Sequence, residues 1–93
     1  MEKLEDFDAA EYLETDADRL QYITEALETG DSAFIARALG TVARSKGIGA
    51  LAGQTGIHRD TLYKSLSADG NPTLKTTLAV MGALGIKLTA QAA

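Results

Sequence analysis

The chain has 93 residues, of which 45% are hydrophobic, and a net charge of −4 at pH 7, so it can form one small globular core but not two. It contains no cysteine, which excludes a disulfide framework, thiolate catalysis and zinc-finger ligation. It has no apolar run near the roughly 18 residues of a membrane span, and its acidic N-terminus lacks an apolar signal core, so we expect a cytoplasmic protein with no membrane partner.

Charge is distributed unequally along the sequence. Residues 1–31 hold eleven carboxylates against two Lys or Arg side chains, a net charge of −9. Residues 32–93 hold two carboxylates against seven Lys or Arg side chains, a net charge of +5. This asymmetry favours two partners of opposite charge, one of them polyanionic and the other basic. The alternative is an acidic segment that only keeps the protein in solution, and the charges alone do not decide between the two.

Residues 1–30 are predicted to form an acidic arm and a helix that packs on the body of the protein. Four apolar side chains should anchor the irregular first fifteen residues: Leu4, Phe7, Tyr12 and Leu13. A helix over residues 17–29 follows, because Thr15 or Asp16 can cap its start and Gly30 can end it. Helical spacing assigns its buried stripe to Leu20, Ile23 and Leu27. Its outer side chains are then Tyr22, Glu25 and Glu28.

Residues 31–93 are predicted to form a second unit, which begins with a central core helix over residues 32–46. Six apolar residues give this helix a wide buried stripe: Phe34, Ile35, Ala38, Leu39, Val42 and Ala43. Gly40 lies inside the helix at a cost of about 1 kcal/mol relative to alanine, which predicts the close approach of a neighbouring helix. The basic residues fall off the stripe: Arg37, Arg44 and Lys46.

The next stretch has the outline of two short helices that cross at a steep angle, over residues 48–54 and 58–67. Ala52 is followed after four residues by Gly56, and Gly56 after six residues by Leu62. The small side chain permits a close crossing, the glycine permits a positive φ, and the leucine packs back on the first helix. This is the outline of a helix-turn-helix, whose second helix normally lies in the major groove of DNA. A purely structural helix pair is the alternative. The residues predicted to hold the pair together are Leu51, Ala52, Gly56, Ile57, Leu62 and Leu66.

The outer face of the second helix is predicted to contact double-stranded DNA. An arginine can read guanine with two hydrogen bonds, a lysine can bind a phosphate, and a tyrosine hydroxyl can reach either. Asp60 is expected to stabilise the start of the helix rather than to accept from cytosine. The only histidine, His58, has no ligand partner at helical spacing, so we predict no metal, cofactor or catalytic site. The predicted DNA contacts are His58, Arg59, Asp60, Thr61, Tyr63, Lys64 and Ser67.

A final helix over residues 74–84 follows a run of turn formers that ends in Pro72. Thr73 should cap this helix and Gly85 should end it. Its predicted core residues are Leu74, Leu78, Met81 and Leu84. Residues 86–90 alternate apolar and polar, which predicts a strand that must pair with a second copy of the chain or with part of residues 1–15. The predicted fold is all-α, with five helices and a short C-terminal β-strand.

Several motifs carry a resemblance to known families. Residues 48–88 resemble the lambda-repressor-like (XRE-type) DNA-binding domains, on the motifs Leu51-Ala52, Gly56-Ile57, Leu62, Asn71-Pro72-Thr73-Leu74 and Ala83-Leu84-Gly85-Ile86. The motifs at 7–13, 26–31, 62–66 and 70–74 extend the resemblance to HigA-type addiction-module antidote proteins. It implies a type II antitoxin that binds a basic toxin of the RelE/ParE superfamily and represses its own operon as a homodimer. The acidic first third would then complement the toxin.

The chain departs from these families where their first helix usually opens with a Thr/Ser-Gln that caps it and touches phosphate. Gly49 and Ala50 occupy those positions, and His58 stands where a capping serine often opens the second helix. Each loss is expected to cost about 1 kcal/mol, so we expect modest operator affinity. Two alternatives stay open: a prophage or stand-alone transcriptional regulator with no toxin, and a protein-interaction module that does not bind DNA. No nucleophile–base pair, carboxylate dyad or phosphate-binding loop predicts an enzyme.

Overall fold

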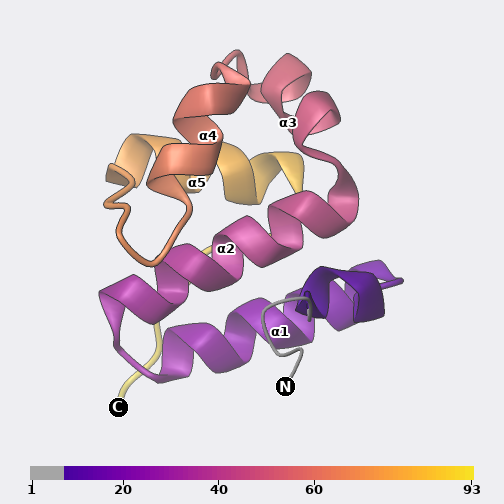
Figure 1. Ribbon diagram of the computed structural model, residues 1–93. Helices are drawn as coiled ribbons and strands as arrows, with labels where there is room; N and C mark the ends of the chain where they lie inside the picture. Colours follow the sequence, from indigo (N-terminus) through magenta and orange to yellow (C-terminus); the bar gives the residue numbers. More distant parts are fainter. Residues whose placement is uncertain (1–7) are drawn as a thin grey trace, which may run out of the picture.

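Residues 8–93 are described by the structure, a computed structural model, and they form one 3-10 helix and five α-helices (Figure 1). In chain order the elements are η2 (Ala9–Tyr12), α1 (Asp16–Glu28), α2 (Ser32–Lys46), α3 (Ile48–Thr55), α4 (Arg59–Ser65) and α5 (Leu74–Ala83). The central helix is α2, which contacts η2 and α1 on one side and α3 and α4 on the other. The five predicted α-helices are therefore confirmed. Within the described residues, no helix has the length and hydropathy needed to cross a bilayer.

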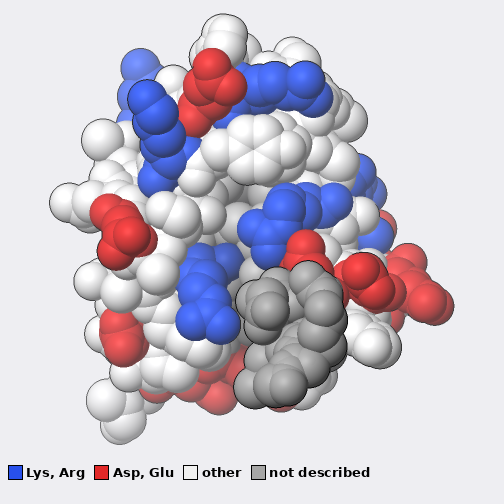
Figure 2. Space-filling view, viewed as in Figure 1, with Lys and Arg blue, Asp and Glu red and all other residues white. Residues whose placement is uncertain are grey.

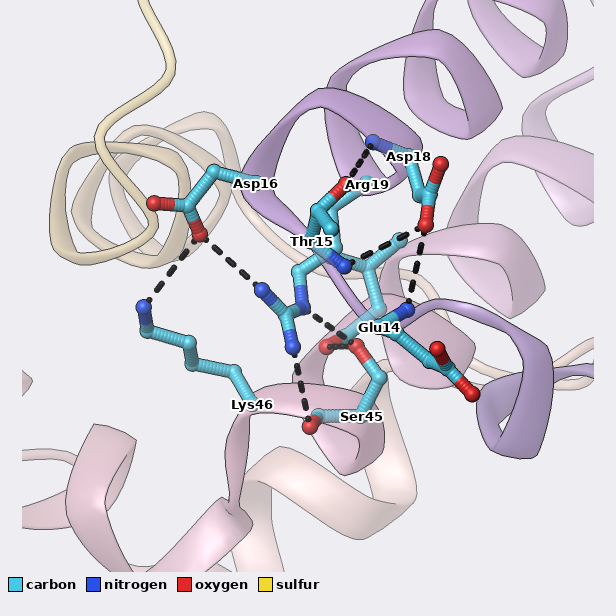
Figure 3. Close-up of polar contacts among 8 residues, drawn as sticks. Glu14, Thr15, Asp16, Asp18, Arg19, Ser45 and Lys46 are labelled. Atoms are coloured by element: carbon cyan, nitrogen blue, oxygen red, sulfur yellow. Dashed lines mark hydrogen bonds and ion pairs between the residues drawn. The ribbon is translucent and has the colours of Figure 1, made fainter.

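Helix α1 begins with a capping box at Thr15, one of the two predicted caps (Figure 3). The Thr15 hydroxyl accepts from the Asp18 N–H at 3.0 Å, and the Asp18 carboxylate accepts from the Thr15 N–H at 3.2 Å. Asp16, at the first position, accepts from Arg19 at 2.9 Å and from Lys46 of α2 at 3.4 Å. Lys46 first, and then Arg19, hold the pKa of Asp16 below its usual value. The first turn of α1 is thus tied to the last turn of α2.

The buried stripe of α1 is rotated from the predicted one. Ile23 and Ala26 are buried against α2, but Leu20 is 51% exposed, so its assignment to the core is wrong. Arg19 lies inward instead: its side chain is 13% exposed, and its guanidinium donates to the Ser45 hydroxyl of α2 at 2.9 Å. The same rotation turns Tyr22, predicted to face outward, partly into the core.

The lead-in to α1 is anchored by Leu13, which packs against the core as predicted. Its neighbour Tyr12 is exposed, because adjacent side chains point in different directions and only one of them can face the core here. The other two predicted anchors, Leu4 and Phe7, lie outside the described residues.

The core forms where α2 meets α3, α4 and α5. Val42 of α2 is fully buried against neighbours that include Leu51 of α3 and Leu62 of α4. The close approach predicted at Gly40 is confirmed, since a Cβ there would overlap the carbonyl oxygen of Leu66. Phe34, predicted as core, is 43% exposed in the first turn of α2, so its assignment to the core is wrong.

Helix α5 buries the second half of its length. Val80, Met81 and Leu84 are in the core, whereas Leu74 and Leu78 are 67% and 47% exposed, so the prediction for those two leucines is wrong. Helix α5 packs on α3 through a stripe centred on Val80 and Met81, which leaves the other face of its first turns uncovered.

The predicted C-terminal strand is also wrong: residues 86–93 contain no strand. After α5, Gly85 has φ +77° and the Ile86 N–H donates to the Met81 carbonyl at 2.8 Å, which closes the helix in a Schellman arrangement. The tail then runs toward α1 (Figure 1). There, Ile86 and Leu88 line a hollow with Leu20 and Leu27. Packing on a helix accounts for the apolar alternation without a ladder partner.

Candidate nucleic-acid interface

The site is built on α3 and α4, two short helices joined by the turn Gly56-Ile57-His58. Gly56 has φ +74°, the left-handed region that favours glycine, and it ends α3. The Thr55 hydroxyl accepts from the Ile57 N–H at 3.2 Å and fixes the turn. The six residues expected to hold the pair together lie at or near the contact: Leu51, Leu62 and Leu66 are buried, Ala52 and Ile57 are partly buried against the core, and Gly56 is in the turn.

The two helices differ at their starts. The N-cap of α3 is Gly47, which has no side chain to accept from the first free N–H groups. The N-cap of α4 is His58, whose Nδ1 accepts from the Asp60 N–H at 3.2 Å. The expected loss of a cap at His58 is therefore wrong, because an unprotonated imidazole nitrogen accepts as a serine hydroxyl would. Only α3 begins without a side-chain cap.

Most of the predicted DNA-contacting residues share the solvent face of α4. The helix spans fewer residues than predicted, so Ser67 lies beyond its end, partly buried, and donates to the Lys64 carbonyl at 3.0 Å. The other six are exposed: His58, Arg59, Asp60, Thr61, Tyr63 and Lys64. One carboxylate, Asp60, accompanies the two cations of this set, and within residues 8–93 no carboxylate forms an ion pair with Arg59 or Lys64.

Arg59 lies beside the uncapped start of α3. Its Nη2 is 3.3 Å from the position that a Cβ on residue 49 would take, so the bare backbone of Gly49 leaves room for the guanidinium. Glycine at position 49 therefore offers no side chain that could contact a phosphate, but it leaves space there for the positively charged guanidinium of Arg59.

The face that presents α4 also presents two arginines of α2. Figure 2 shows basic side chains over α4 and α2, with acidic ones among them at the top and at the left edge, and further acidic ones lower and to the right, over η2 and α1. Arg37 and Arg44 line a hollow of about 280 Å³ between the helices, together with Tyr63 and Ser67. Sequence reasoning placed both arginines off the core stripe but gave them no role. Gly40 could have indicated their role, because it marks the place where α4 crosses α2 and lies between Arg37 and Arg44 on the same face of α2.

Arg44 is joined to the start of the described chain. It donates to both carboxylate oxygens of Asp8, through Nη2 at 2.9 Å and Nε at 3.2 Å. These hydrogen bonds from Arg44 hold the pKa of Asp8 below its usual value, and the Asp8 carboxylate raises the pKa of Arg44. Elsewhere within residues 8–93, no three His, Asp or Glu side chains gather in a way that could hold a metal ion.

Comparison with known proteins supplies the context for this surface. The sequence model of a family described as probable addiction module antidote protein matches residues 3–92. An uncharacterized protein of Haemophilus influenzae (strain ATCC 51907 / DSM 11121 / KW20 / Rd) is 40% identical over 90 residues, which cover 97% of this chain and 93% of that protein. No solved structure matches the chain.

Proposed function

The chain belongs to the family of probable addiction module antidote proteins, and from this premise we propose that it is a HigA-type antitoxin of a type II toxin–antitoxin module. In this proposal it neutralises a basic toxin of the RelE/ParE superfamily in the cytoplasm. It also represses its own operon through a lambda-repressor-like helix-turn-helix made of α3 and α4. We propose no enzymatic activity. Residues 1–30 bind the toxin, and residues 31–93 bind the DNA.

The observation that carries the DNA proposal is the charge of one face in a protein that is acidic overall. Arg59 and Lys64 stand exposed on α4, without carboxylate partners among the described residues, in a chain of net charge −4. Charges separated by more than about 8 Å are largely screened at physiological ionic strength, so the local positive face rather than the net charge governs the approach to phosphate. Arg59 is proposed to read guanine, and Lys64 to bind phosphate.

A single copy presents one α4 of seven residues, which can enter one segment of major groove. A homodimer would present two such helices to half-sites about 34 Å apart, one turn of the duplex. Dimerisation therefore supplies affinity that the uncapped α3 does not. The dimer contact is not assigned to the tail, because residues 86–93 form no strand.

The surface proposed for the toxin is the outer face of η2 and α1. Exposed carboxylates on this surface include Glu11, Glu25 and Glu28, and Glu14 is exposed between the two helices. Deletion of residues 1–30 is a poor test of this surface, because Ile23 and Ala26 belong to the core and their loss would unfold the protein. Charge reversal at Glu25 and Glu28 changes the surface and leaves the core intact.

The proposed toxin binding is tested in cells that express the basic protein encoded next to this chain. Co-expression of the wild-type chain should restore growth, and the double variant Glu25→Lys/Glu28→Lys should restore it less while still repressing a reporter driven by the module's promoter. Full rescue by the double variant would place the toxin contact elsewhere. The absence of any neighbouring gene for a basic protein would favour the stand-alone regulator.

The proposed DNA binding is tested with the same reporter. Arg59→Ala and Lys64→Ala should relieve repression, whereas Lys87→Ala, which removes a cation from the tail, should not. Repression unchanged in both α4 variants would place the DNA contact outside α4. No repression by the wild type would favour a protein-interaction module that does not bind DNA, the alternative that the uncapped α3 supports.

A further inference from the structure

Helix α2 brings two arginines to the proposed DNA-binding face. We propose that Arg37 and Arg44 form a second phosphate contact beside α4, and that Asp8 occupies part of this contact until DNA displaces it. This inference rests on the proposed DNA binding. It adds two contacts and a competing carboxylate from the same chain.

The first argument is the placement of the two arginines. Arg37, Gly40 and Arg44 recur at spacings of three and four residues, so they share one face of α2. At the middle position the backbone of Leu66 comes so close that a Cβ on Gly40 would overlap it. The arginines therefore flank the crossing of α4, about 10 Å apart along the axis of α2. A duplex that contacts Tyr63 and Ser67 would bring phosphates to the same hollow.

The second argument is the charge state of each arginine. Arg37 is exposed, and no carboxylate among residues 8–93 forms an ion pair with it. Arg44 is 39% exposed at its side chain and is neutralised by the two hydrogen bonds to Asp8. One arginine is thus available to a polyanion, and the other is available only in exchange for Asp8.

The third argument is the geometry of the exchange. The guanidinium of Arg44 donates two bonds to two oxygens on one carbon, and the same fork fits two oxygens on one phosphorus. Asp8 therefore stands where a phosphate group would bind. Its side chain is 38% exposed, so water and salt screen the pair and a polyanion can compete with it.

The ion pair has a simpler interpretation, in which Asp8 only fastens η2 to α2. Under that interpretation, removing the carboxylate would change folding stability but not DNA binding. The dependence of binding on salt separates the two interpretations, because each phosphate that a protein neutralises contributes about −0.9 to the slope of log K against log salt concentration.

The test uses the full chain and a labelled duplex of the module's promoter, with fluorescence anisotropy in KCl from 50 to 200 mM. Asp8→Asn should tighten binding and steepen the slope by up to about 0.9, and Arg37→Gln should weaken binding and flatten the slope by about 0.9. Asparagine keeps the N-cap of η2, so the change removes the charge and spares the helix.

The matched control for Asp8→Asn is Asp31→Asn. Asp31 is also an N-cap, accepting from the Ala33 and Phe34 N–H groups, and the substitution gives the same change in net charge. The matched control for Arg37→Gln is Lys87→Gln in the tail. Both controls should leave the slope unchanged, and circular dichroism melts should show all four variants folded.

The outcomes distinguish this inference from the proposed function. If the wild type binds and Lys64→Ala flattens the slope, but Asp8→Asn behaves as Asp31→Asn does, the competition between Asp8 and DNA is refuted. A slope unchanged by Arg37→Gln overturns the contact from α2. If the wild type shows no salt-sensitive binding to the promoter, the proposed DNA function itself fails and the inference fails with it.

Discussion

Replacing Gly40 with alanine should destabilise the protein, although alanine is the better helix former. Gly40 lies inside α2, where the propensity gain alone would stabilise the helix by about 1 kcal/mol. A Cβ at this position, however, would overlap the carbonyl oxygen of Leu66 and lie 3.2 Å from its carbonyl carbon. Backbone atoms cannot move aside by changing rotamer, so α4 must shift away from α2.

The expected loss follows from these opposing effects. Overpacking of a core contact costs about 1–3 kcal/mol, and a clash with backbone belongs at the upper end of that range. Subtracting the propensity gain leaves a net loss of about 2 kcal/mol. In a domain of this size, that loss lowers the Tm by roughly 8–16 °C.

The control is Gly53→Ala in α3. A Cβ on Gly53 would meet no atom within 4 Å, so this variant should gain up to about 1 kcal/mol from propensity alone. Urea unfolding followed by circular dichroism at 222 nm measures both variants. If Gly40→Ala is as stable as Gly53→Ala, the close crossing of α2 and α4 is refuted.

Three further predictions concern the folding free energy. Leu62→Ala, at a fully buried position, should lose about 2–5 kcal/mol in urea unfolding, and stability equal to the wild type would contradict its place in the core. Thr15→Ala should lose about 1 kcal/mol through the capping box, whereas Thr15→Ser should retain most of it; equal losses would contradict a role for the hydroxyl. Because Arg44 lowers the pKa of Asp8 in the folded state, the ion pair stabilises the protein above the unfolded pKa of about 3.9 and ceases to do so as the pH falls through the lower folded value. The difference in unfolding free energy between the wild type and Asp8→Asn should therefore stay constant from pH 7 to 5, at under about 1 kcal/mol, and change below about pH 4. A difference that stays constant to pH 2 would refute this linkage.

The helices were predictable because their signals are local. Caps such as Thr15 and breaks such as Gly47 lie within a few residues of the boundaries they set, and the helical period needs no knowledge of the partner. The identity of the buried stripe is less local. Arg19 displaces Leu20 from the inner face of α1 because Ser45, 26 residues away, offers it a hydrogen bond.

The tail shows where a short pattern becomes ambiguous. Alternation over five residues fits a strand, but it also fits an extended segment whose Ile86 and Leu88 rest on a helix. A strand requires a ladder partner to satisfy its backbone groups, and residues 8–93 provide none. Sequence alone gave no means of weighing the two arrangements.

Only the part of the candidate site that lies on α4 could be predicted from the sequence. The residues on α4 follow from a contiguous motif, so their shared face could be read from the sequence. Arg37 and Arg44 join that face only through the crossing of α4 over Gly40, and Asp8 reaches Arg44 across 36 residues. Contacts of this kind depend on tertiary packing, which periodicity does not encode.

The central claim is that this antidote protein binds its own operator through α4. The most direct measurement is the affinity of the purified full-length protein for the promoter duplex of its module and for a scrambled duplex of equal length and composition, at physiological salt. We predict a preference of about 10³-fold for the promoter, at the low end for specific DNA-binding proteins because α3 begins without a cap, and its loss in Arg59→Ala. Equal affinity of the wild type for the two duplexes would contradict the account.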